Sequence, residues 1–239
     1  ETTPFPVQIF NGNNLFGTVT ISKGAPQTVS IPYNLMMTDD VREMFKPNSL
    51  GLNVKGPKKF FANFRFEVPS HAEIVTSKGL AGIGKTFFAA MAPNTTAKAY
   101  LTSTIGIIAT EDNTVVNISG YDAAIVFADE TQSPTKNFTL DKGQSYILNV
   151  KSSDAQANLT GLIGAKIEAS NPISVSNGNF NAIYTFENFT NNDVLMDQSV
   201  PIERLGKDFI LVKGNGPALN NMESGLIVAT EDNTKITVN

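Results

Sequence analysis

Ile108-Ala-Thr-Glu-Asp-Asn-Thr-Val-Val-Asn-Ile118 decides the fold, because this stretch returns as Val228-Ala-Thr-Glu-Asp-Asn-Thr-Lys-Ile-Thr-Val238. The two copies begin 120 residues apart in a chain of 239 residues. In each copy, apolar residues precede a corner of Glu, Asp, Asn and Thr, and alternating Val or Ile residues follow it. Asp and Asn at such a corner can bond their own backbone. Each copy therefore predicts a hairpin of two strands.

The repeat extends well beyond these two stretches. Three further pairs lie at similar offsets: Gly84–Phe88 with Gly206–Ile210, Val19–Gly24 with Phe138–Gly143 and, more loosely, Val54–Phe64 with Ile167–Asn177. Self-similarity at a fixed period indicates a duplicated structural unit. We expect a first β repeat unit at residues 5–117 and a second at residues 118–239. The length suits either one pseudo-symmetric domain or two tandem domains.

Composition indicates the fold class. Thr, Val, Ile, Phe and Asn are abundant, Gly and Pro separate short segments, and no long segment keeps a helical apolar period. These features are typical of many short strands. The sequence predicts an all-β, internally duplicated, sandwich-like fold. The segments with strand length and strand residues are 17–22, 59–66, 122–127, 145–150 and 208–212.

One short helix is predicted near residues 38–45. Thr38 is a suitable cap, and Asp39 and Asp40 place acids in the first turn, where the helix dipole favours them. Pro47 follows and would end the helix.

Charge and composition exclude several classes of function. The net charge is −4, and the 18 Lys and Arg residues are scattered, so nucleic acid is not an expected partner. No apolar run approaches the roughly 20 residues that a spanning helix needs, which argues against membrane insertion. The absence of cysteine excludes disulfides and thiol chemistry. Because the chain begins at Glu1 and ends after a strand-like segment, we expect a fragment of a longer protein.

Gly79-Leu-Ala-Gly-Ile-Gly-Lys-Thr86 fits the phosphate-loop pattern of nucleotide hydrolases. Ala124–Glu130 resembles the apolar strand and acids that would hold Mg²⁺ in such an enzyme. The pattern requires a helix after the loop, whereas Pro93 would end any helix early. The second unit has Gly206-Lys207-Asp208 at the matching position. We therefore interpret the motif as a Gly-Lys turn that enters a strand, with a nucleotide hydrolase as the minor alternative.

The paired acids Glu111, Asp112, Glu231 and Asp232 are candidate metal ligands, with calcium as the possible cofactor. Short acids are also expected at hairpin corners for their turn geometry, so both interpretations stay open. No catalytic residues are predicted, since His71 is the single histidine and lies in a loop-like segment.

Aromatic residues set among Asn suggest a ligand-binding surface for sugar or protein. The alternative for the same residues is packing in a strand core. The candidates are Phe180, Tyr184, Phe186 and Phe189.

A resemblance to a known family rests on the order of several motifs. These are Ser77–Phe88, the Ala-Thr-Glu-Asp-Asn-Thr corner, Leu140-Asp-Lys-Gly-Gln-Ser-Tyr146, Ala169-Ser-Asn-Pro-Ile-Ser-Val175 and Gly178-Asn179. In this order they resemble the N-terminal module of the IgG Fc-binding protein family. That module is also found in large secreted proteins of Bacteroidetes, many of which end in a type IX secretion sorting domain.

The resemblance implies a non-enzymatic recognition or adhesion module, secreted or at the cell surface, with gliding motility among the associated roles. The implied partners are a glycan, mucin or protein ligand and the secretion machinery of the parent protein. A purely structural spacer domain is the main alternative. The resemblance carries over no binding residues, and it does not imply that this chain binds immunoglobulin Fc.

Overall fold

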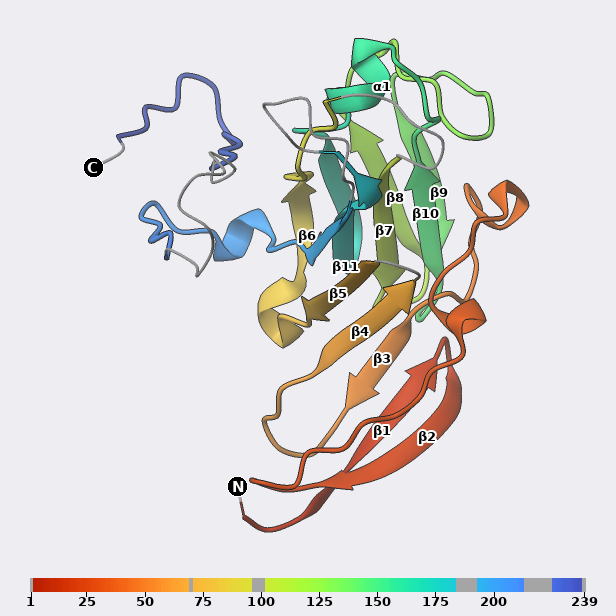
Figure 1. The fold of residues 1–239 in the computed structure, drawn as a ribbon, viewed down its shortest axis with the longest axis vertical. Helices are drawn as coiled ribbons and strands as arrows, with labels where there is room; N and C mark the ends of the chain where they lie inside the picture. Colours follow the sequence, from red (N-terminus) through yellow and green to blue (C-terminus); the bar gives the residue numbers. More distant parts are fainter. Residues whose placement is uncertain (1, 69–70, 96–101, 184–192, 213–224, 238–239) are drawn as a thin grey trace.

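The structure is a computed structural model that describes residues 2–68, 71–95, 102–183, 193–212 and 225–237. Within these residues strands dominate, which confirms the predicted all-β class. Two small N-terminal sheets lie beside a larger seven-stranded sheet (Figure 1).

The N-terminal part contains a three-stranded sheet in the order β2-β1-β3 and a separate hairpin of β4 and β5. All pairs are antiparallel. Phe5, Val7 and Ile9 alternate along β1 and are buried, as expected of a strand with one face on a core. The bounds are β1 Phe5–Asn11, β2 Asn14–Ile21, β3 Leu52–Lys55, β4 Asn63–Val68 and β5 His71–Thr76.

The seven-stranded sheet is built around β11, which is 17 residues long. Its path runs β10-β7-β11-β8-β9, and β6 and β12 also pair with β11. The bounds are β6 Ile83–Phe88, β7 Ser103–Ala109, β8 Thr114–Ser119, β9 Lys136–Leu140, β10 Ser145–Asn149, β11 Lys166–Ala182 and β12 Asp193–Gln198.

The two halves of β11 pair with different neighbours. Residues 166–169 pair with β8, whereas residues 173–179 pair with β7. Pro172 lies between the halves and has no N–H for a ladder bond. The ladder with β6 is interrupted at the same place. β11 therefore joins a β9-β8 layer to a β10-β7 layer, and apolar side chains of both layers form one buried cluster, as in sandwiches where a strand changes sheet at a bend.

The corner at residues 110–113 connects β7 to β8, but these strands form no ladder with each other. The predicted strands on both sides of the corner are confirmed, whereas their pairing as a hairpin is wrong. The corner and the start of β8 instead bond to the bend of β11. The hydroxyl of Thr110 donates to the Pro172 carbonyl at 2.6 Å, and the N–H of Val115 donates to the Ser170 hydroxyl at 2.9 Å.

The short helix predicted at residues 38–45 is wrong in place and extent. Only a 3-10 turn forms there, η2 at Val41–Glu43, and the carboxylate of Asp40 caps it through the Arg42 N–H at 2.9 Å. The N–H of Phe45 donates to Ile147 of β10 at 3.0 Å. Because the backbone of this segment bonds to the edge strand β10, the same groups cannot form the hydrogen bonds of a helix. The short α-helix, α1, is at Gln156–Thr160.

Two predicted strands are also absent from the described residues. Residues 122–127 form a turn in which the Asp122 carboxylate accepts the Ala124 N–H at 2.9 Å. Buried Asn158 bonds both backbone groups of Val126, at 3.1 and 3.0 Å. Within the described residues this segment keeps an isolated bridge from Phe127 to Val150 but forms no strand. Residues 208–212 are exposed and unpaired within the described structure.

We expect Ile167→Ala to lower the free energy of unfolding by about 2–5 kcal/mol, because the truncation leaves a cavity in the core. Ile167 is fully buried in β11 and belongs to the shared cluster. Val115→Ala is the control, since Val115 is exposed on neighbouring β8 and should change stability by less than about 0.5 kcal/mol. Urea unfolding measures both, and equal effects would contradict a single core beneath β11.

Two buried tyrosines predict a loss of stability at alkaline pH. Burial raises the pKa of Tyr121 to about 12, and burial together with the nearby charge of Asp129 raises the pKa of Tyr146 to about 12. The unfolded value is about 10. Folding thus favours the neutral phenols, and this contribution is complete below pH 10 and lost as the pH rises towards 12.

Tyrosinate absorbance and unfolding measured across that pH range test the prediction. Tyr146→Phe should flatten the fall in stability, while Tyr33→Phe should not, because Tyr33 is exposed. If the stability of the Tyr146 variant falls with pH as steeply as that of the parent chain, the raised pKa of Tyr146 is not the cause of the fall.

Candidate functional site

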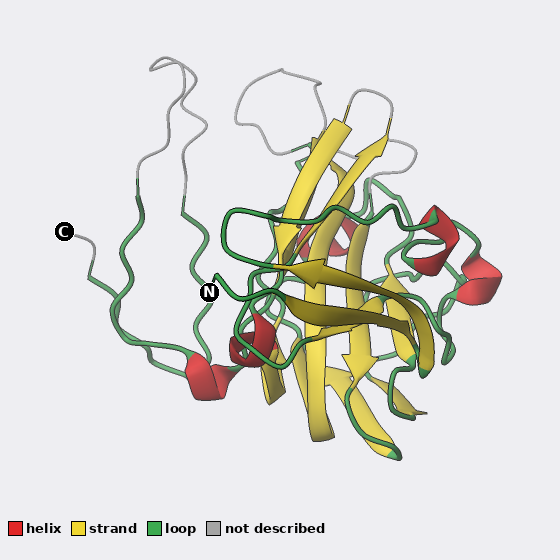
Figure 2. Ribbon diagram, turned by 90° about the horizontal axis from the view of Figure 1, so that it is seen from below, coloured by secondary structure: helices red, strands yellow, loops and turns green. Residues whose placement is uncertain are grey.

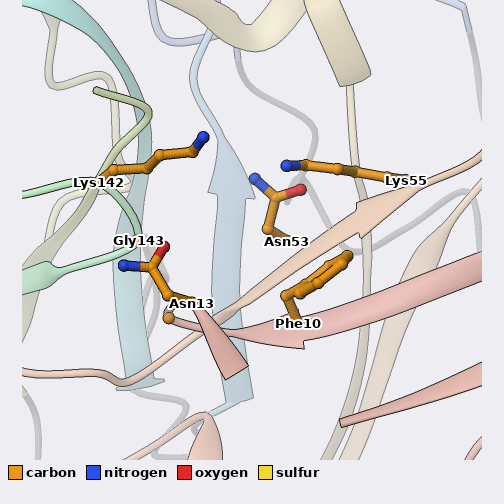
Figure 3. Close-up of a pocket in the computed structure, with 7 residues that line it drawn as sticks. Phe10, Asn13, Asn53, Lys55, Lys142 and Gly143 are labelled. Atoms are coloured by element: carbon orange, nitrogen blue, oxygen red, sulfur yellow. The ribbon is translucent and has the colours of Figure 1, made fainter. Parts of the chain in front are cut away.

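A hollow of about 210 Å³ lies where the N-terminal sheet meets the turn between β9 and β10 (Figure 3). Seven residues line it: Phe10, Gly12, Asn13, Asn53, Lys55, Lys142 and Gly143. β1 supplies the aromatic ring, the β1–β2 turn supplies Gly12 and Asn13, and β3 supplies Asn53 and Lys55. The hollow therefore joins parts of the chain that are far apart in sequence.

Backbone geometry brings the two turns of the hollow together. Gly12 has φ 57° and Gly143 has φ 78°, in the left-handed region that glycine adopts without strain. A Cβ at Gly143 would stand 2.8 Å from the carbonyl carbon of Gly12. Only glycine at position 143 permits this approach.

The acidic corner of the first repeat holds the Lys142 turn in place. The carboxylate of Asp112 accepts the backbone N–H of Lys142 at 3.0 Å, and the carboxylate of Asp141 accepts the N–H of Asn113 at 3.1 Å. The corner and the turn thus cap each other, and the position of Lys142 follows from the repeated Glu-Asp-Asn-Thr sequence.

The charge of the hollow is positive. Lys142 and Lys55 extend from opposite sides, with the Asn53 amide between them (Figure 3). The Lys55 ammonium lies 5.3 Å from the Phe10 ring centroid. Neither lysine has an ion-pair partner within 4.0 Å among the described residues. Two ammonium groups, amide groups and an aromatic face can together hold an anion that carries an apolar surface.

The phosphate-loop motif does not have the structure that phosphate binding requires. Gly79–Gly82 forms a 3-10 turn, η3, and the following residues form strand β6 rather than a helix. The Lys85 ammonium donates to the Ser170 carbonyl at 2.6 Å. Residues 124–130, proposed to hold Mg²⁺, contain turns and no strand. The strand is confirmed for this copy, but Gly84 and Lys85 lie within β6, and the turn that precedes the strand is η3.

The acidic corners have the same turn geometry in both repeats. Asn113 and Asn233 have φ of 54° and 59°. The hydroxyls of Thr114 and Thr234 each donate to the carbonyl of the Glu three residues earlier, at 2.7 Å. In the described part of the chain no three His, Asp or Glu side chains gather as a metal site would need. Calcium binding at Glu111, Asp112, Glu231 and Asp232 stays a prediction.

Of the four candidate aromatic residues, the structure places one. Phe180 lies on β11, is 37% exposed, and its ring centroid is 5.6 Å from that of Phe66 on β4. Phe66 in turn stacks on Phe64 at 5.4 Å, so Phe180 packs between strands while part of its ring faces solvent. Tyr184, Phe186 and Phe189 lie outside the described residues.

Comparison with protein families matches residues 76–239 to the family described as IgGFc binding protein. This range is more than two thirds of the chain. The chain belongs to the IgGFc-binding protein family. Comparisons with curated proteins and with solved structures each gave no significant match.

The IgGFc-binding family is one of binding modules rather than enzymes, and its modules are typically extracellular. Lys142 and Gly143 lie within the matched range, whereas the other residues of the hollow precede it. In the described residues, none of the helices has the length and apolar character needed to cross a bilayer.

Sequence reasoning does not single out the hollow. Its two lysines lie in different halves of the chain, and in each half they read as ordinary surface residues. A partial signal exists, because Lys142 belongs to the repeated Phe138–Gly143 segment. That segment predicts a turn, but the sequence gives no sign that the turn meets β1 and β3.

We expect Gly143→Ala to destabilise the fold by about 2 kcal/mol or more, combining left-handed strain of about 1–3 kcal/mol with a backbone clash. Gly24→Ala is the matched control, since Gly24 has φ 80° but no atom within 4 Å of the place that a Cβ would take. Urea unfolding compares the two variants. Equal losses would mean that the approach of Gly12 to Gly143 does not constrain the fold.

Proposed function

We propose that the chain is a non-enzymatic recognition module of a secreted or cell-surface protein, and that it binds an acidic ligand at the hollow of Lys55 and Lys142. Membership of a family of extracellular binding modules supports the general role. The observation that carries the site is the pair of ammonium groups without ion-pair partners, facing each other across one cavity within the described structure.

The ligand chemistry follows from the lining of the hollow. Lysine ammonium groups bind carboxylate or sulfate groups, and the Asn13 and Asn53 amides can bond hydroxyls. The Phe10 ring offers a flat apolar face, so an acidic sugar fits this combination. The chain carries a net charge of −4, which disfavours general attraction of polyanions. We therefore propose an acidic glycan of the mucin type as the ligand.

The motif order of the sequence supports a narrower setting. It resembles modules of large secreted Bacteroidetes proteins that carry type IX sorting domains, so we propose an adhesin-like parent protein exported by that machinery. The family description names immunoglobulin Fc, and Fc is accordingly one of the protein ligands to be tried. Adhesion through exposed loops on a β scaffold suits such a parent.

We expect saturable binding to sialylated or sulfated glycans on an array, and weaker binding to the matched neutral glycans. Lys55→Ala and Lys142→Ala should each weaken binding about tenfold or more, because a charge-assisted hydrogen bond contributes about 1.5–3 kcal/mol. Lys151→Ala is the control, since its ammonium already pairs with Glu130 at 2.7 Å. Titration of the best array ligand by calorimetry measures each effect.

The same array is run with mucins, matrix proteins and immunoglobulin Fc, with calcium and again with a chelator. Loss of binding in the chelator would support the acidic corners as calcium ligands. Equal binding by the lysine variants and the parent chain would contradict the proposed site. Absence of any saturable ligand, with a working positive control, would favour a structural spacer.

A further inference from the structure

The C-terminal segment that contains Phe209 exposes a strand-like apolar sequence. Phe209 is 68% exposed, and the three residues after it are exposed more strongly still. Its sequence counterpart in the first repeat is Phe87 in β6, which is 0% exposed. After the 3-10 turn η4, at Ile202–Arg204, the segment runs away from the sheets as a loop (Figures 1 and 2). The matched phenylalanine is thus buried in the first copy and exposed in the second.

The strands around these two copies pair in the same order and register. In the N-terminal sheet Val7 pairs with Val19 and Ile9 pairs with Val54. In the large sheet Val116 pairs with Phe138 and Ile118 pairs with Ile167. The ladder β2-β1-β3 therefore matches β9-β8-β11 in register, and the matched residues agree with the repeat seen in the sequence.

The elements that follow these ladders correspond as well. The hairpin β4–β5 ends at Thr76 and is followed by η3 and β6. The antiparallel pair β11–β12 ends at Gln198 and is followed by η4 and the exposed segment. β12 packs against β5, so the two pairs of strands are neighbours. The segment after η4 thus has the position in its repeat that β6 has in the first.

Within the described residues, the N-terminal sheet has one strand fewer than the matching part of the large sheet. The first half of β11 has β8 on one edge and β6 on the other. Its counterpart β3 has β1 on one edge and, among the described residues, no strand on the other. Val54 of β3 is accordingly 37% exposed, although its cross-strand neighbour Ile9 is only 6% exposed.

We propose that residues 206–212 form the fourth strand of the N-terminal sheet, paired antiparallel with the free edge of β3 in the same chain. The register follows from β6 on β11, where Phe87 pairs with Ile167 and Thr86 with Glu168. Phe209 then lies opposite Val54, and Asp208 lies opposite Lys55.

This register satisfies both faces of the sheet. Phe209 covers Val54 on the face that buries Phe5, Val7 and Ile9, and removal of this apolar surface from water favours pairing. On the other face, Asp208 and Lys55 form an opposite-charge pair across the ladder. Pairing also removes an exposed edge and an exposed apolar segment, both of which promote aggregation. The Asp208 carboxylate then competes with an anionic ligand for Lys55.

Engineered cysteines test the pairing without background, because the chain has no cysteine of its own. The test variant is Lys55→Cys with Asp208→Cys. Directly opposite residues of an antiparallel pair have Cα atoms about 4.5–5.5 Å apart, within the range of a disulfide. Mild oxidation, followed by thiol titration and non-reducing electrophoresis, should show an intrachain disulfide.

Two matched variants make the result decisive. Thr86→Cys with Glu168→Cys is the positive control, since these residues pair in the structure. Lys55→Cys with Lys207→Cys is the negative control, because a shift of one residue points the side chain to the other face. A disulfide-linked dimer in the test variant would show exchange of the strand between copies, and it would overturn pairing within one chain. No disulfide, with a working positive control, would overturn the proposal.

A stability measurement tests the same proposal independently. Phe209→Ala should lower Tm by several degrees, because the paired Phe209 is buried against Val54. Leu80→Ala is the control, since Leu80 is exposed in η3 and should leave Tm unchanged. Equal Tm values for the Phe209 variant and the parent chain would contradict the buried strand.

Discussion

The bend in β11 is the constraint on which the rest of the structure depends. At Ser170–Pro172 the strand leaves the ladder with β8 and enters the ladder with β7. The corner after β7 bonds directly to this bend, through the Thr110 hydroxyl to Pro172 and the Val115 N–H to Ser170. Because β7 and β8 are joined by so short a corner, both can pair with β11 only if β11 bends. The shared core between the two layers follows from that geometry.

The same corner also positions the candidate site. The Asp112 carboxylate bonds the backbone of the β9–β10 turn, and the Asp141 carboxylate bonds the backbone of the corner. Asp112, a candidate metal ligand, thus also acts as a cap. The turn held in this way presents Lys142 and brings Gly143 against Gly12 of the N-terminal sheet. A repeated sequence with a structural role thus determines where the charged side chains of the hollow lie.

The sequence predicts what depends on local pattern and fails where tertiary bonds intervene. The all-β class, the strands at residues 17–22 and 145–150 and the turn at Asn113 follow from alternation and turn chemistry. At residues 38–45 the backbone bonds to the edge of β10 instead of forming a helix. At residues 122–127 the Asp122 and Asn158 side chains bond the backbone, and an isolated bridge forms in place of a strand. The lysines of the hollow come together only because two distant turns are in contact. No local sequence pattern predicts that contact.

The two repeats show that burial is a property of the neighbouring strand as much as of the sequence. Phe87 and Phe209 follow matching Gly-Lys pairs in the sequence, yet Phe87 is buried and Phe209 is exposed. The strand that encloses Phe87 is β11, which belongs to the other repeat. β6 of the first repeat thus pairs with an edge of β11 in the second. We infer from this exchange that residues 5–239 act as one pseudo-symmetric domain, in which the edge of β3 and the segment after η4 are the two halves of a matching contact.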